Sequence, residues 1–143
     1  MNSVFKKGKW HKAVKKAKTE RRKLRDQLDK LWSEIVKQRA GNVCEYKTCS
    51  KTTYLNAHHI FGRSNLSVRW DLDNGVCLCP QHHTLGNNSA HKAPAEFIEW
   101  IKEMWGIEWY ESLRKKASQT KKWTIPELRE KVKEFKREIK KCQ

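Results

Sequence analysis

The chain has 143 residues, enough for one domain with a modest core. Its 32 Lys and Arg against 16 Asp and Glu give a formal net charge of +16, which favours a polyanionic partner, nucleic acid first and an anionic membrane surface second. A membrane-spanning helix and a secretion signal are both disfavoured, because no apolar run reaches the length of a span and none follows the basic N-terminus. The expected location is therefore the cytoplasm, where five cysteines are better explained as metal ligands or free thiols than as disulfides.

The N-terminal part, residues 1–41, is predicted to be a basic arm followed by a helix. Residues 1–18 are basic and lack periodicity, so we expect an arm or a helix that forms only on binding. From residue 19 to 39 the spacing of apolar residues is helical, and Gly41 follows as a stop signal. The apolar stripe consists of Leu24, Leu28, Leu31 and Ile35, widened by Trp32 and Val36.

The middle part, residues 42–93, loses the helical period. The stretches "TYLNAHHI" and "GVCLC" are short and contain β-branched or aromatic residues, as strands do. A loop rich in Gly, Ser, Asn and Asp separates them, and residues 80–92 are irregular with room for a short turn of helix. This part carries five basic and three acidic residues, so it is nearly neutral, yet it contains most of the cysteines and histidines. It is predicted to be a compact site between basic helical flanks.

The C-terminal part, residues 94–143, is predicted to be helical. Pro94 suits the first turn of a helix that Gly106 ends, and "IEWYESLRKKA" continues as a second helix. Thr124 and Glu127 have the spacing of a capping box. The stripe that follows is too short for a convincing coiled coil, so we expect the two end helices to pack on each other or on the core rather than to dimerise. That stripe is Ile125, Leu128, Val132, Phe135, Ile139 and Cys142.

Two pairs of residues have the spacing of a structural zinc site. Cys44 and Cys49 are separated by four residues, and Cys79 and His82 by two, with some 30 residues between the pairs. Thiolates and imidazole suit zinc, and a closed tetrahedral site needs four ligands. The alternative is buried free cysteines, but the polar stretch "NVCEYKTCSK" gives Cys44 and Cys49 no reason to be buried. Cys77 could compete as a ligand, although the spacing favours Cys79 and assigns Cys77 to the core.

Four further residues form a second pattern, His58-His59, Asn74 and His83. With the zinc pairs around it, the stretch "HHIFGRSN…VRWDLDNGVCLC…HH" resembles the HNH (ββα-metal) endonucleases, in particular small phage-type members with zinc knuckles. The resemblance covers about residues 42–93. It implies an α+β fold, in which a ββα-metal core with a structural zinc site is flanked by N- and C-terminal helices.

The resemblance also implies a role for each residue of the pattern. His58 and His83 would hold a catalytic divalent ion (Mg²⁺, Mn²⁺, Ni²⁺ or Zn²⁺), and His59 would be the general base that takes a proton from water. Asn74 would tie the loop to the strand and keep His59 in orientation. The family usually has a zinc cysteine before its last histidine, whereas this chain has His82 there, which leaves open how His82 and His83 divide between the two metals.

The residue types suit phosphodiester hydrolysis independently of the family. A neutral histidine can accept a proton from water near neutral pH, and neighbours on a strand point to opposite faces, so His58 and His59 can serve metal and base separately. Arg63 and Arg69 are possible phosphate contacts, with solvated side chains the equal alternative. His91 is either an additional metal ligand or a histidine without a role.

These observations predict a metal-dependent endonuclease that acts on DNA, double-stranded DNA first, and that has no membrane partner. The alternative from another class is a catalytically silent zinc-containing DNA-binding protein, which would need the zinc pairs and the basic flanks but not His59. An RNA-binding zinc protein would explain the charge but not the pattern of His58, His59, Asn74 and His83.

Overall fold

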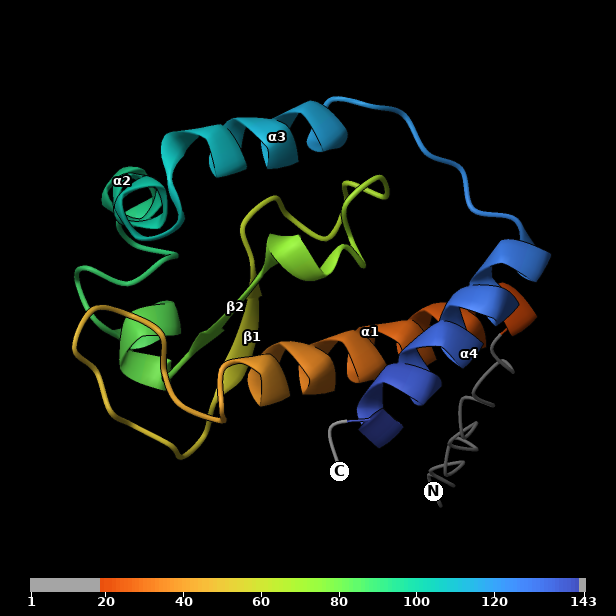
Figure 1. The fold of residues 1–143 in the computed structure, drawn as a ribbon, viewed down its shortest axis with the longest axis horizontal. Helices are drawn as coiled ribbons and strands as arrows, with labels where there is room; N and C mark the ends of the chain where they lie inside the picture. The colour runs from red at the N-terminus through yellow and green to blue at the C-terminus, as the bar shows by residue number, and fades with distance from the viewer. Residues whose placement is uncertain (1–18, 142–143) are drawn as a thin grey trace, which may run out of the picture.

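The computed structural model describes residues 19–141 and places helices on both sides of a small two-stranded sheet (Figure 1). The expected arm, residues 1–18, and Cys142 lie outside the described residues. Helices and an antiparallel sheet within one chain agree with the predicted α+β class. The elements in chain order are α1 (Glu20–Arg39), β1 (Asn56–His59), β2 (Gly75–Leu78), α2 (Pro94–Trp105), α3 (Ile107–Ala117) and α4 (Ile125–Lys141), with a 3₁₀ turn at Leu72–Asn74 and a π-helical turn at Gln81–Leu85.

The sheet consists of β1 and β2 in antiparallel register, with His58 opposite Val76 and His59 opposite Gly75. Both strands are shorter than the sequence predicts. Tyr54 has a positive φ of 55°, which an extended strand does not allow, so β1 begins only at Asn56. Two strands alone are marginally stable, so this sheet depends on what packs against it.

Helix α1 covers one face of the sheet at very close range. A Cβ atom at Gly75 would lie 2.4 Å from Cγ2 of Val36 and 2.8 Å from Cζ2 of Trp32, both on α1. Only glycine allows this approach of strand to helix. The sheet therefore meets α1 at the point where β2 begins, next to His59 on the paired strand.

Helices α1 and α4 pack side by side on this side of the sheet, as expected for the two end helices (Figure 1). The predicted capping box begins α4: the Glu127 amide donates to Thr124 Oγ1 at 3.3 Å, and the Thr124 amide donates to Glu127 Oε2 at 2.7 Å. The buried residues that the helix pair shares with the middle part are Leu28, Trp32, Ile35, Val36, Trp70, Leu128, Val132, Phe135 and Ile139.

A second apolar cluster lies on the other side of the sheet, where α2 and α3 pack (Figure 1). Phe97, Trp100 and Ile101 of α2 are buried against the cysteine-containing loops. The middle part is thus held between two helical layers. Within residues 19–141, no helix combines the length and the apolar character that a membrane crossing requires.

Candidate functional site

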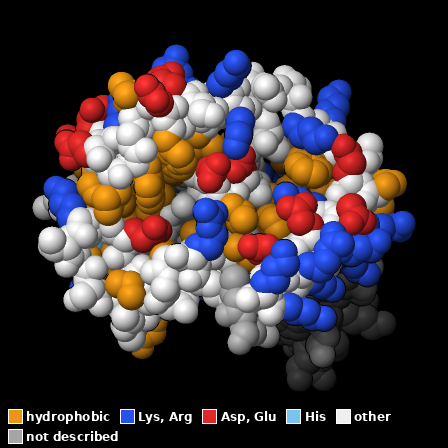
Figure 2. Space-filling view, viewed as in Figure 1, with side chains coloured by type: hydrophobic (Ala, Val, Ile, Leu, Met, Phe, Trp, Pro, Cys, Tyr) orange, Lys and Arg blue, Asp and Glu red, His pale blue; other side chains and the backbone are white. Residues whose placement is uncertain are grey.

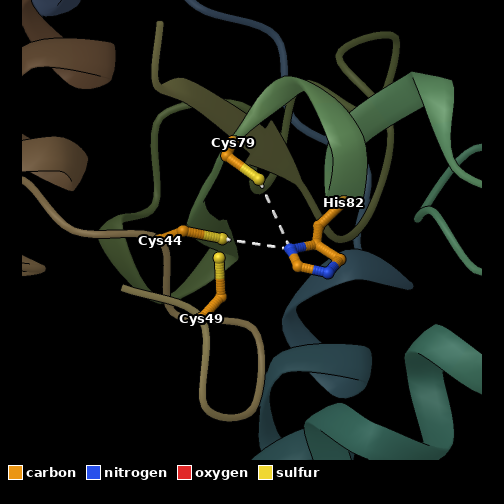
Figure 3. A group of neighbouring side chains, drawn as sticks. All are labelled: Cys44, Cys49, Cys79 and His82. Carbon is orange, nitrogen blue, oxygen red and sulfur yellow. Dashed lines mark hydrogen bonds between the residues drawn. The ribbon is translucent and has the colours of Figure 1, made fainter. Parts of the chain in front are cut away.

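Three cysteines and a histidine meet at the end of the sheet, beneath α2. Cys44 and Cys49 come from the loop between α1 and β1, Cys79 follows β2, and His82 lies in the turn after it (Figure 3). Their four ligand atoms all lie within 4.8 Å of one another. The two pairs that the spacing selected are therefore brought together, and the cluster can hold a metal ion such as zinc.

The distances within this cluster fit a tetrahedral ion. Nδ1 of His82 lies 3.5 Å from Sγ of Cys44 and 3.4 Å from Sγ of Cys79. Bonds of about 2.3 Å from zinc to sulfur and about 2.0 Å to nitrogen separate tetrahedral sulfur and nitrogen ligands by about 3.5 Å. His82 is also fixed from behind, because its ring stacks on Tyr46 with 4.4 Å between centroids.

Local backbone structure explains why these side chains converge. In the first loop the Cys49 amide donates to the Tyr46 carbonyl at 3.0 Å, and Lys47 adopts a φ of 48°, which turns the chain back between the two cysteines. In the second segment the His82 amide donates to the Cys79 carbonyl at 3.1 Å. Each pair therefore sits on a tight turn of its own.

The thiols of the cluster differ in acidity. Burial raises the pKa of Cys44 to about 12. Burial also raises the pKa of Cys79, but hydrogen bonds from the His82 amide and from the thiols of Cys44 and Cys49 outweigh it and lower that pKa overall. Cys79 therefore ionises before Cys44, and metal binding must displace the proton of Cys44.

Cys77 does not join the cluster. It is fully buried in β2 opposite Ala57, and its amide donates to Oε2 of Glu45 at 2.7 Å. The Glu45 amide in turn donates to the Cys77 carbonyl at 2.9 Å, so Glu45 joins the cysteine loop to the edge of β2. No sequence pattern indicates this role for Glu45, because it depends on pairing between distant segments of the chain.

Three histidines, one on β1 and two in the segment after β2, form a second cluster. The ligand atoms of His58, His83 and His91 lie within 4.8 Å of one another, and Nε2 of His91 is 3.2 Å from Nε2 of His83. Two nitrogen ligands of one tetrahedral or octahedral ion, each about 2.1 Å from it, lie about 3.0–3.4 Å apart. His91, whose role the sequence left open, is placed here because its amide donates to the His83 carbonyl at 3.2 Å. The described residues thus offer three imidazoles for one ion.

Burial keeps His58 and His83 of this cluster neutral. Burial, together with the neighbouring imidazoles of His83 and His91, lowers the pKa of His58 to about 3. Burial also lowers the pKa of His83. Neutral imidazole is the form that binds metal ions, so no proton must be removed from the rings of His58 and His83 near neutral pH.

His59 points away from this cluster and is held by two contacts. Its ring stacks on Trp32 of α1, with 3.8 Å between centroids, and its Nε2 lies 2.9 Å from the carbonyl oxygen of Arg69. A carbonyl oxygen only accepts, so Nε2 carries the hydrogen and Nδ1 keeps its lone pair. Burial lowers the pKa of His59 to about 4, which leaves the ring neutral and able to take up a proton.

Asn74 closes the loop between the strands. Its side chain is fully buried; Oδ1 accepts from the Phe61 amide at 2.7 Å, and Nδ2 donates to the carbonyls of Phe61 and Val68 at 2.9 and 3.0 Å. None of these hydrogen bonds goes to His59. Asn74 acts one step away, by fixing the segment that ends at Arg69, whose carbonyl orients the His59 ring.

Asp29 of α1 is a site residue that the sequence analysis missed. Its carboxylate accepts from Nε of Arg69 at 2.9 Å, from NH2 of the same residue at 2.6 Å and from Nε1 of Trp70 at 2.8 Å. Arg69 also donates to the Arg63 carbonyl, and its side chain is 12% exposed. Arg69 therefore braces the loop, and Arg63 is the arginine of the predicted pair that lines the open cavity. No sequence pattern marks Asp29, because its partners lie some 40 residues away.

The two histidine arrangements open into one cavity of about 520 Å³. His58, His83 and His91 line it together with His59, and Asp29 and Arg63 complete the polar part of the wall. A candidate metal cluster and a neutral imidazole with a free nitrogen thus face the same space. No protein-family model, curated protein or solved structure matches the chain.

Proposed function

We propose that the protein is a metal-dependent endonuclease that hydrolyses phosphodiester bonds in double-stranded DNA, as its resemblance to the HNH family implies. The observation that supports this most is the shared cavity. Three imidazoles that can hold one ion and a fourth with a free Nδ1 line the same space. Metal binding alone does not explain the fourth imidazole, whereas hydrolysis needs both a metal and a base.

His58 and His83 would hold the catalytic divalent ion, with His91 as a third ligand. When bound, such an ion stabilises the charge that develops on the phosphate and on the leaving oxygen. Three imidazoles leave coordination positions for phosphate and water, because a catalytic site must stay open on one side. The π-helical turn and the backbone bond between His91 and His83 hold two of these rings in place before DNA arrives.

His59 would be the general base. Its Nδ1 would take a proton from the attacking water, while Nε2–H stays on the Arg69 carbonyl and stabilises the ring as it becomes charged. Trp32 fixes the ring plane from one side. Asn74 and Asp29 are positioning residues, since both hold the segment that presents the Arg69 carbonyl.

The cluster of Cys44, Cys49, Cys79 and His82 would hold a structural zinc ion. This cluster fastens the end of β2 to the loop before β1, and His82 directly precedes His83. The net charge of +16 supports DNA as the partner, because phosphate contacts dominate affinity for nucleic acid.

The proposal is tested by incubating supercoiled plasmid with the purified protein, with and without an added divalent metal. His59→Gln is the informative variant: its amide can still donate to the Arg69 carbonyl and pack on Trp32, but it cannot accept a proton from water. Cleavage should fall about 10²–10⁴-fold, the usual range for loss of a general base, with an unchanged thermal midpoint.

Two outcomes would contradict the proposal. If a folded His59→Gln protein cuts at the normal rate, His59 is not the general base. A folded wild-type protein that binds DNA but cuts it with none of Mg²⁺, Mn²⁺, Ni²⁺ or Zn²⁺ leaves the catalytically silent zinc-containing DNA-binding protein as the better description.

A further inference from the structure

A second hollow, of about 350 Å³, lies at the beginning of α1 and is lined mainly by arginines. Four arginines from two segments of the chain line it, together with one aspartate. Its lining residues are Thr19, Arg21, Arg22, Arg25, Asp26 and Arg69. We call it the arginine hollow.

Among the residues that the structure describes, two of these arginines have no partner for their charge. Arg21 donates to the Trp123 carbonyl, and Arg69 is paired with Asp29. Among the described residues, the guanidinium groups of Arg22 and Arg25 form no hydrogen bond or ion pair. The amide of Arg22 donates to Thr19, the N-cap of α1, so the partial positive charge of the helix N-terminus adds to that of the arginines. Like charges gathered in this way repel one another unless an anion lies between them.

The arginines of the hollow differ in their charge balance from the basic side chains of α4. Figure 2 shows those side chains gathered over that helix. Most of those are balanced by acidic neighbours: Lys131 pairs with Glu134, and Lys133 and Arg137 both pair with Glu130. A solvated helix face has this mixed pattern. The arginine hollow does not, because it combines a concave surface with two guanidinium groups that no residue within 19–141 pairs.

The arginine hollow adjoins the histidine cavity. Arg69 lines the hollow, Asp29 lines the cavity, and the ion pair between them, at 2.6 Å, forms the shared wall. At 1.5 Å of helix per residue, Arg22 and Arg25 precede Asp29 by about 6–10 Å along α1. Each DNA strand carries one phosphate per about 3.4 Å of axis, so this distance corresponds to about two or three nucleotides.

We propose that the arginine hollow binds a backbone phosphate of DNA, two or three nucleotides from the phosphate in the histidine cavity. The inference rests on the proposed function for its choice of partner. Guanidinium groups bind phosphate oxygens through two parallel N–H donors, so Arg22 and Arg25 are suited to one phosphodiester group. This contact reads no sequence; it sets the register of the DNA on the protein.

The test compares two double variants that remove the same charge. Arg22→Ala/Arg25→Ala empties the hollow of its unpaired arginines. Lys136→Ala/Lys140→Ala is the matched control, since both lysines are exposed on α4 and form no ion pair among the described residues. Binding of a fluorescent DNA duplex is measured by anisotropy over a range of NaCl concentrations, in the His59→Gln background, which should slow any cutting about 10²–10⁴-fold.

The arginine pair should weaken binding to every duplex sequence and lower the slope of log K against log salt by about 1, the value for one lost phosphate contact. The control pair should change the slope by less than half as much. Equal losses for the two pairs would overturn the proposal, because they would show that only net charge matters. A loss confined to vesicles of anionic lipid, with DNA binding intact, would overturn it as well.

The two proposals fail separately. If wild-type protein cuts no DNA but the arginine pair still shows its selective loss, the arginine hollow stands and the nuclease does not. If wild-type protein cuts plasmid and the arginine pair behaves as the control does, the nuclease stands and the arginine hollow does not.

Discussion

Asn74→Ala should be among the most damaging single substitutions in this protein. The side chain is fully buried and makes three hydrogen bonds, one from the Phe61 amide and two to the carbonyls of Phe61 and Val68. Alanine removes all three partners at once and leaves a small cavity. The loop that connects β1 to the 3₁₀ turn then loses its only buried polar side chain among the described residues between 60 and 75.

The expected loss is about 3 kcal/mol of unfolding free energy, since each hydrogen bond contributes about 1 kcal/mol net and unpaired buried groups cost at least as much. For a protein of this size, about 3–5 °C of thermal midpoint corresponds to each kcal/mol, so the midpoint should fall by about 10–15 °C. Asn74→Asp should not restore the loss, because a carboxylate can accept from Phe61 but repels the two carbonyls.

Thermal and urea unfolding of the wild-type and Asn74→Ala proteins measure this loss of unfolding free energy directly. Asn56→Ala is the matched control, since its amide makes a single exposed hydrogen bond to Tyr54 and its loss should stay within about 0.5 kcal/mol. If Asn74→Ala costs no more than Asn56→Ala, the reasoning about buried hydrogen bonds in this loop is wrong. If cleavage is observed, its rate in Asn74→Ala should fall further than the folded fraction, because the loop also carries the carbonyl that orients His59.

Three further perturbations probe other parts of the structure. Purified protein should contain about one tightly bound zinc per chain, and a strong chelator should abolish its cooperative unfolding transition, whereas elemental analysis that finds folded protein without zinc would contradict the structural metal. Asp29→Asn should release the brace on the loop, so ¹⁵N NMR of the His59 ring should change from one Nε2–H tautomer to a mixture; unchanged ring signals would show that Asp29 plays no positioning role. Gly75→Ala should destabilise the protein by about 1–3 kcal/mol through its clash with Val36 and Trp32, and adding Val36→Ala should recover part of the loss; a stable single variant would contradict the close approach of α1.

Local signals in the sequence predicted the helices well. The helix expected over residues 107–117 is α3 with the same bounds, and Pro94 begins α2 as its position suggested. The capping box at Thr124 begins α4. These features depend on residues close together in the chain, so the sequence contains what is needed to see them. The bounds of the two strands were predicted only approximately. The backbone at Tyr54 departs from extended geometry, and no glycine at this position indicates that in the sequence.

The zinc-type cluster could also be found from sequence, because its two pairs lie on tight turns where spacing decides geometry. His91 was harder, since it lies eight residues after His83 in an irregular segment and reaches it through one backbone hydrogen bond. Asp29 could not be found at all. It looks like a solvated charge on an amphipathic helix, and only the folded chain brings it to Arg69 and Trp70.

These differences place α1 inside the candidate site rather than beside it. A two-stranded sheet cannot hold four histidines in place unaided. The sheet is supported at one end by the cluster of cysteines and His82, and at the other by α1, where Trp32 stacks on His59 and packs within van der Waals distance of Gly75.

Two pairs of adjacent histidines divide between these supports. His82 belongs to the cysteine cluster while His83 faces the cavity, and His58 joins His83 while His59 turns to α1. In each pair, one histidine is held by a support and the next faces the cavity. The support therefore constrains the second ring through the single peptide unit that joins the two residues. His58 and His83 are thus positioned by the cysteine cluster and His59 by α1, so the distance between the histidine cluster and the His59 ring depends on both. A helix that the sequence marks only as amphipathic and basic therefore determines where the His59 ring lies.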